Sequence, residues 1–257
     1  MVENVMGARR PPWLSPADLV REGVARTVAA GPVFWGIWAV YGIVAAAAQL
    51  GARAAGLAVL TQPLASASIA YQLLLILSGT LAAVLGLRLL LRGSEGWWRL
   101  DRTALYAAGL LVVGQVSLTA VSMLLTGSMI GGQFAIGRYL VGLVLYIAGI
   151  YALGKLALWP VGIIAGRADM TPARAWRMMR RTLRSLVLSM ILLGLPVAAI
   201  SIYGAVVLRM NPQAQPTAMV LALTLAATLM SLVNQGVIVS IYDRRGGRPE
   251  TLGDVFE

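Results

Sequence analysis

The hydrophobic positions of this chain are gathered into six long runs that shorter polar stretches separate. Each run is long enough to cross the hydrocarbon core of a bilayer as a helix, which takes about 20 residues. Open sheets cannot satisfy their backbone groups in lipid, and the runs lack the alternating polarity of a membrane β-barrel. We therefore predict an all-α polytopic membrane protein, a single membrane domain over 1–257 with transmembrane helices near 32–54, 67–91, 103–126, 134–158, 185–208 and 217–242.

The distribution of basic residues predicts the orientation of these helices. Seventeen arginines lie in the two terminal segments and in the second and fourth connections, whereas three lie on the opposite side. Because basic connections stay in the cytoplasm, we predict a multi-pass protein of the bacterial inner membrane with N-terminus and C-terminus both cytoplasmic. All seven tryptophans fall near this same side, as expected for indole rings at a membrane boundary. Orientation thus explains the net charge of +11, and we expect no nucleic-acid partner.

Two segments on the basic side, near 16–28 and 172–184, have the pattern of short amphipathic helices at the membrane surface. Ser15 and Thr171 each precede a proline and are expected to cap these helices. In the second segment, arginines at intervals of three and four residues line one face. This cluster either binds anionic lipid headgroups or a membrane protein partner, or it only orients the protein. Its candidate binding residues are Arg174, Trp176, Arg177, Arg180, Arg181 and Arg184. The tail, 251–257, contains another capping pattern and either docks on the bundle or frays.

Polar side chains also follow one face of the third span and one face of the sixth. They are Gln115, Thr119, Ser122 and Thr126 in the third, and Thr217, Thr224, Thr228, Ser231, Asn234 and Gln235 in the sixth. Such residues either form interhelical hydrogen bonds, worth roughly 0.6 kcal/mol each, or line a hydrophilic cavity or headgroup groove between the two spans. Pro196 is expected to kink the fifth span. Arg138 and Lys155 lie near opposite ends of the fourth, and both are expected to snorkel to the interfaces.

The residue inventory excludes much chemistry. The chain has no cysteine and no histidine, which removes disulfides, thiol nucleophiles, imidazole bases and the usual zinc, haem and iron–sulfur ligands. No carboxylate occurs in the predicted spans before Asp243, so aspartyl proteases and carboxylate proton relays are excluded as well. We expect no catalytic residue, no metal site and no cofactor.

Three local motifs carry a family resemblance. They are Trp159-Pro160-Val161 after the fourth span, Ala173-Arg174-Ala175-Trp176-Arg177 before the fifth, and Ile241-Tyr242-Asp243-Arg244 closing the sixth. With these motifs the chain resembles the six-helix membrane domain found with some bacterial glycerophosphoryl diester phosphodiesterases, and the stand-alone YciC-like proteins. The resemblance implies the architecture alone, because the diesterase activity of that family belongs to a separate soluble domain.

These observations predict a non-catalytic integral inner-membrane protein that binds membrane lipids, anionic ones above all, or a membrane protein partner. The alternative is a permease component or small-solute transporter that uses the two polar stripes. A third hypothesis is an enzyme of lipid metabolism, which would require a serine nucleophile paired with Lys155, and no motif supports such a pair.

Overall fold

The computed structural model describes residues 14–55, 66–130, 136–167, 169–210 and 217–245. All regular secondary structure in these ranges is helical, so the all-α prediction is confirmed. The elements are α1 (Pro16–Ala29), α2 (Gly31–Ala54), α3 (Ser66–Arg92), α4 (Arg102–Ile130), α5 (Ile136–Leu156), α6 (Leu158–Ile164), α7 (Pro172–Met178), the 3-10 turn η1 (Met179–Arg181), α8 (Leu183–Met210) and α9 (Thr217–Arg244).

Six stretches of these helices are long and apolar enough to cross a membrane. They are Gly31–Ala54, Ile69–Arg92, Arg102–Ser122, Tyr139–Ile164, Leu183–Gly204 and Thr217–Arg244, close to the six predicted ranges. The fourth stretch is divided between α5 and α6, which are separated at Ala157. The chain is therefore a multi-pass membrane protein.

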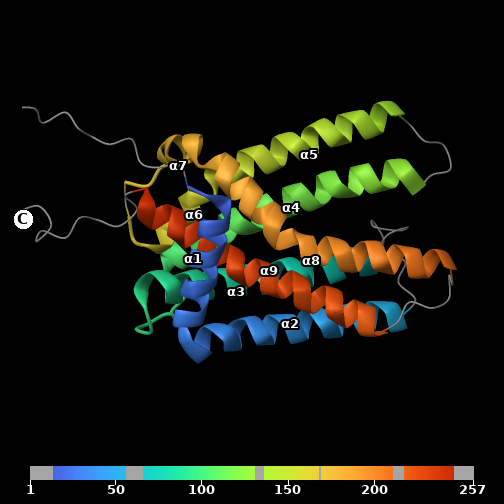
Figure 1. Ribbon diagram of the computed structural model, residues 1–257, viewed down its shortest axis with the longest axis horizontal. Helices are drawn as coiled ribbons and strands as arrows, with labels where there is room; N and C mark the ends of the chain where they lie inside the picture. Colours follow the sequence, from blue (N-terminus) through green and yellow to red (C-terminus); the bar gives the residue numbers. More distant parts are fainter. Residues whose placement is uncertain (1–13, 56–65, 131–135, 168, 211–216, 246–257) are drawn as a thin grey trace, which may run out of the picture.

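The helix α9 is the centre of the bundle. It packs against α1, α2, α3 and α8, and its half nearer the C-terminus is buried almost continuously from Leu232 to Tyr242. The helices α4 and α5 form a hairpin that lies to one side of this group (Figure 1), joined to it mainly through α3 and α6. Figure 1 also shows that α8 bends along its length, and Pro196 lies inside this helix as the sequence predicted.

The helix α1 crosses the bundle instead of running along it (Figure 1). Its range agrees with the predicted segment 16–28, but the Ser15 side chain forms no capping hydrogen bond. The Ser15 carbonyl instead accepts the Leu19 N–H at 3.0 Å. At the other end, Gly31 has a φ of 81°, a value that favours glycine, and this residue makes the corner from α1 into α2.

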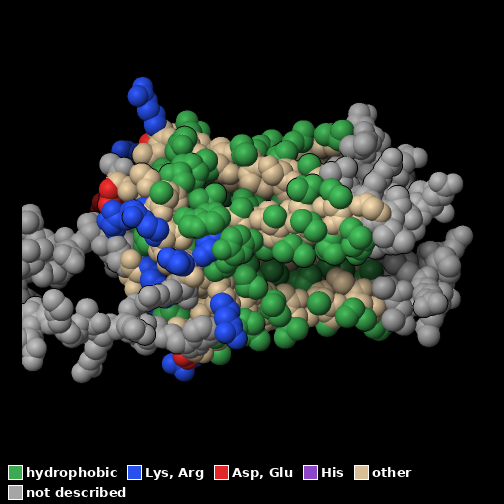
Figure 2. Space-filling view, turned by 90° about the horizontal axis from the view of Figure 1, so that it is seen from above, with side chains coloured by type: hydrophobic (Ala, Val, Ile, Leu, Met, Phe, Trp, Pro, Cys, Tyr) green, Lys and Arg blue, Asp and Glu red, His purple; other side chains and the backbone are tan. Residues whose placement is uncertain are grey.

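Charged side chains gather at the end of the bundle that holds α1, α6 and α7 (Figure 2). We call this the arginine-rich end; among its residues are Arg26, Arg88, Arg174 and Arg244. The apolar sides of the spanning helices extend away from it. Charge and hydrophobicity are thus separated along the bundle, as required of a chain that enters lipid.

The prediction of a single helix over 172–184 is wrong, because the structure divides this segment into α7, η1 and the start of α8. Thr171 caps α7 as predicted, accepting the Arg174 N–H at 3.2 Å. The chain then tightens into η1, and α8 begins at Leu183. Thr182, between them, is buried, and its hydroxyl accepts a hydrogen bond from Arg245 Nε at 2.7 Å. This tertiary contact lies at the break. The tail 251–257, predicted either to dock on the bundle or to fray, lies outside the described residues.

Candidate functional site

The helices α1 and α9 cross closely at the arginine-rich end. A Cβ atom built on Gly236 would lie 2.3 Å from the backbone oxygen of Gly23, and one built on Gly23 would lie 2.9 Å from the backbone nitrogen of Val237. Only glycine permits two backbones to approach this closely. No local pattern in the sequence indicates this pair, because its two members are far apart along the chain.

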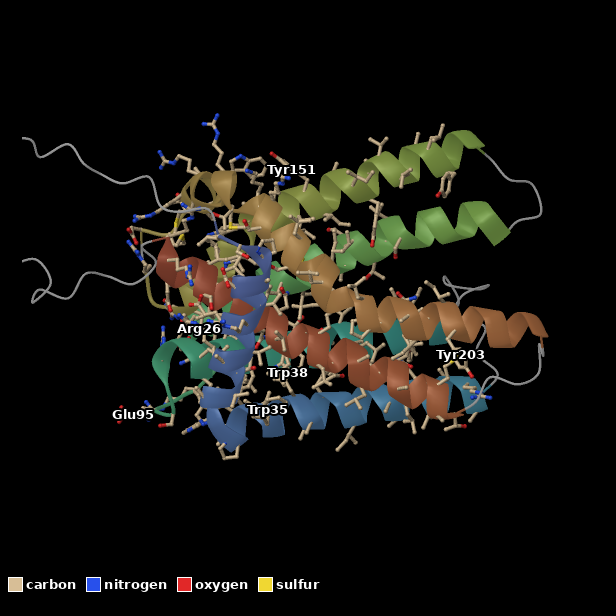
Figure 3. The ribbon with its side chains drawn as sticks, in the orientation of Figure 1. Arg26, Trp35, Trp38, Glu95, Tyr151 and Tyr203 are labelled. Atoms are coloured by element: carbon tan, nitrogen blue, oxygen red, sulfur yellow. The ribbon has the colours of Figure 1, made fainter. Side chains whose placement is uncertain are left out.

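Ion pairs join the same two helices beyond the glycine contact. Arg26 contacts Asp243 at 2.7 Å, and Arg244 contacts Glu22 at 2.7 Å, with Glu22 also 3.4 Å from Arg26. Each partner is at least partly exposed, so each pair is worth about 1 kcal/mol or less. Figure 3 shows Arg26 on α1 where this helix passes α9. Glu22 of α1 and Asp243 of α9 are therefore already paired within the protein.

A second polar cluster joins the end of α3 to the start of α4. Arg88, buried in α3, donates to Asp101 at 2.8 Å. Asp101 also accepts from the Thr103 hydroxyl at 2.6 Å and from the Ala104 N–H at 2.9 Å, so it caps α4. The hydrogen bonds from Thr103 and from the Arg88 guanidinium hold the pKa of the Asp101 carboxyl well below its usual range. Asp101 also lies 3.5 Å from Arg92, so one carboxylate is shared by two arginines within the protein.

The loop before α7 uses one of the predicted binding arginines. Asp169 pairs with Arg167 at 2.9 Å and also with Arg174. The hydrogen bond from Arg167 lowers the pKa of the Asp169 carboxyl, so this residue is anionic at neutral pH. Arg174, predicted as a binding residue, is therefore engaged in an internal ion pair.

The other predicted residues of the arginine cluster are largely exposed. Trp176 is 40% exposed, and Arg177, Arg180 and Arg184 are exposed as well. Among the residues that the structure describes, neither Arg177 nor Arg180 has an ion-pair partner. The side chain of Arg181 lies outside the described part. The cluster thus contributes at least two exposed cations to the arginine-rich end.

Lys155 departs from the prediction that it snorkels. It is only 4% exposed, and its Nζ lies 5.5 Å from the ring centroid of Tyr151 and 5.9 Å from that of Trp176. The two rings contact each other edge to face, 5.9 Å apart, and join α5 to α7 (Figure 3 labels Tyr151). No carboxylate among the described residues lies within 4.0 Å of this ammonium. The ammonium is held by cation–π contacts, each worth up to about 2 kcal/mol when desolvated.

The polar stripes of the third and sixth spans do not meet. In the described chain α4 packs mainly on α5, α3 and α6, whereas α9 packs on α1, α8, α2 and α3. The hypothesis of a cavity between these two spans is therefore wrong, because other helices lie next to each stripe. Gln115 and Ser231 are exposed on their helices, Thr217 is exposed too, and Thr119, Ser122 and Asn234 are half-buried. Thr126 lies on α4, but its side chain is outside the described part.

The buried members of the α9 stripe form contacts within the bundle. Thr224 donates to Gln49 of α2 at 3.1 Å, and Gln235 Nε2 donates to the Ala83 carbonyl of α3 at 2.9 Å. These are interhelical hydrogen bonds, one of the two roles predicted for the polar stripes.

A groove between α2 and α9 includes residues of a predicted stripe. It has a volume of about 530 Å³. Thr224 and Thr228 of α9 line it, together with Trp35 and Trp38, which Figure 3 labels on α2. The remaining lining residues carry no polar side-chain group: Ala39, Gly42, Ile43, Ala46, Leu221, Leu225, Leu229 and Leu232. An apolar lining of this kind suits hydrocarbon, and it does not suit a hydrated solute.

The fold and these sites define the class of the protein: an all-α, multi-pass membrane protein with a polar end that is rich in arginine. Comparison with protein-family models, with curated proteins and with solved structures finds no match for the chain. The resemblance to the YciC-like proteins stays a prediction.

Proposed function

We propose that this chain is a non-catalytic, lipid-binding protein of the bacterial inner membrane, with both termini in the cytoplasm and the arginine-rich end at the cytoplasmic leaflet. One observation carries the proposal. Glu22 of α1, Asp243 of α9 and Asp169 before α7 are paired internally, while Arg177 and Arg180 stay exposed without an ion-pair partner among the described residues. Exposed cations beside spanning helices attract anionic headgroups.

The magnitude of this attraction sets the expected affinity. Each basic residue near an anionic leaflet contributes about 1 kcal/mol, so Arg177 and Arg180 together contribute about 2 kcal/mol. This corresponds to roughly a 30-fold preference for an anionic lipid over a zwitterionic one. Because the residues are exposed, salt screens the preference. The surface therefore collects anionic lipid without selecting one species.

The test is lipid retention by the purified protein. Native mass spectrometry of the wild type in mixed phosphatidylglycerol and phosphatidylcholine nanodiscs should show preferential retention of phosphatidylglycerol. The variant Arg177→Gln/Arg180→Gln should reduce that preference by up to about 30-fold at low salt. The matched control is Arg21→Gln/Arg102→Gln, which removes two exposed arginines from α1 and α4 and leaves α7 intact.

Two results would contradict the proposal. Equal loss of preference in the two double variants would mean that total charge matters and that α7 does not. Unchanged retention in the α7 variant, with unchanged thermal stability, would mean that these arginines serve orientation alone.

A further inference from the structure

The buried lysine of α5 is the feature of this molecule that the proposed function does not use. Lys155 is the only lysine in the chain, and its side chain is covered by the rings of Tyr151 and Trp176. Taking an ammonium out of water is costly, and the usual compensation is an anion or several hydrogen-bond acceptors. Within the described ranges no carboxylate lies within 4.0 Å of the Lys155 ammonium, so an anion is missing and the two rings offset only part of the cost.

The acidic residues of the neighbouring elements do not supply this anion. Asp169, which precedes α7, is taken by Arg167 and Arg174. Asp101, before α4, is taken by Arg88 and Arg92, and Asp243 of α9 by Arg26. The described helices around Lys155 thus leave a buried positive charge that lacks its counterion.

The covering rings place this charge close to the surface of the bundle. Tyr151 is 50% exposed and Trp176 is 40% exposed, so Lys155 lies one side chain beneath the surface. Both belong to the residue types that gather at the headgroup layer, and both carry a hydrogen-bond donor at the polar edge of the ring. A phosphodiester is the anion available at that depth.

We propose that Lys155, Tyr151 and Trp176 form a binding site for the phosphate group of a phospholipid, with the ammonium as the counterion and the two rings as its walls. This inference rests on the proposed function and makes it specific, because it assigns one lipid to one buried position. Burial makes the contact less sensitive to salt than the contacts of Arg177 and Arg180. The protein therefore binds lipids at the exposed arginines, which salt displaces, and one lipid at Lys155, which salt does not displace.

A single lysine makes a direct test possible, because selective ¹³Cε-lysine labelling yields one lysine signal. The protein in maltoside micelles, which contain no phosphate, is titrated with a phosphatidylglycerol, with a diacylglycerol of the same chains, and with inorganic phosphate. We expect phosphatidylglycerol to shift the signal and diacylglycerol to leave it unchanged. No shift with phosphatidylglycerol overturns the proposal, and an equal shift with inorganic phosphate overturns the lipid as the source of the anion.

A variant series separates this site from the exposed arginines. In native mass spectrometry at 0.5 M salt, where the Debye length is about 4 Å, the wild type should retain one phosphatidylglycerol. The Lys155→Met variant should retain at least tenfold less of this lipid, whereas Lys155→Arg should retain as much as the wild type. Arg177→Gln/Arg180→Gln should keep both this lipid and the lysine shift, so failure of the surface proposal is distinguishable from failure of this one. Retention of the salt-resistant lipid by a folded Lys155→Met variant would refute the site.

Discussion

Replacing Gly236 with alanine is the substitution for which the structure makes the sharpest prediction. The added methyl group would lie 2.3 Å from the Gly23 oxygen and 2.9 Å from the Gly23 Cα and carbonyl carbon. All three are backbone atoms, so no side-chain rotation relieves the overlap, and α1 must move away from α9. Overpacking of this kind costs about 1–3 kcal/mol.

The displacement also affects the ion pairs next to the glycine contact. Moving α1 lengthens the Arg26–Asp243 and Arg244–Glu22 distances, both of which are 2.7 Å in the native protein. The loss of each ion pair costs at most about 1 kcal/mol more. The better helix propensity of alanine returns about 1 kcal/mol. The net loss is therefore about 2 kcal/mol, the middle of a range of about 0–4 kcal/mol, which corresponds to roughly 4–8 °C in Tm for a chain of this size.

The assay is thermal unfolding of the detergent-solubilised protein, followed by circular dichroism at a fixed heating rate. The matched control is Gly36→Ala on α2, where an added Cβ has no neighbour within 4 Å and only the gain in helix propensity remains. We expect this control to be neutral or slightly stabilising. If Gly236→Ala unfolds at or above the temperature of Gly36→Ala, the two backbones do not touch and the reasoning is refuted.

Three further predictions concern other parts of the molecule. Because the pKa of Asp101 is lower in the folded protein than its ordinary 3.8, its pairing with Arg88 stabilises the fold above that pH, and this stabilisation is lost as the pH falls. The variant Asp101→Asn should therefore lose less Tm than the wild type between pH 5 and pH 3, and an equal loss in both proteins would contradict this. Gln235→Leu removes the hydrogen bond to Ala83 and should cost roughly 0.6 kcal/mol in a chemical unfolding titration, whereas a loss of several kcal/mol would show that this contact has been underestimated. Reporter fusions at the two termini and beside Arg177 should all give cytoplasmic signals, and a signal from outside the cell at any of them would invert the orientation.

The six spans were predictable because hydrophobic length is a local property of the sequence. Each apolar run needs only the bilayer as its partner, so its position does not depend on the rest of the fold. The range of α1 was predictable for a similar reason, since Pro16 and the following apolar periodicity are local signals.

The site features that were missed depend on contacts between distant residues. Nothing near Gly23 in the sequence indicates that Gly236 faces it, and periodicity identifies the polar face of α9 without identifying α2 as its neighbour. Lys155 was expected to reach the interface because lysine near a helix end usually does; the rings of Tyr151 and Trp176 cover it instead, and Trp176 comes from a different helix. The break at Thr182 likewise coincides with a bond from Arg245.

The crossing of α1 over α9 has a consequence for the order of assembly. The helix α1 is synthesised before α9, yet the glycine and the charged residues that hold α1 in place belong to α9. Until α9 is inserted, Gly23 lacks the backbone of Gly236 and Arg26 lacks Asp243. The docking of α1 on α9 therefore follows the insertion of α9, and a chain released before α9 is complete would leave this contact unmade.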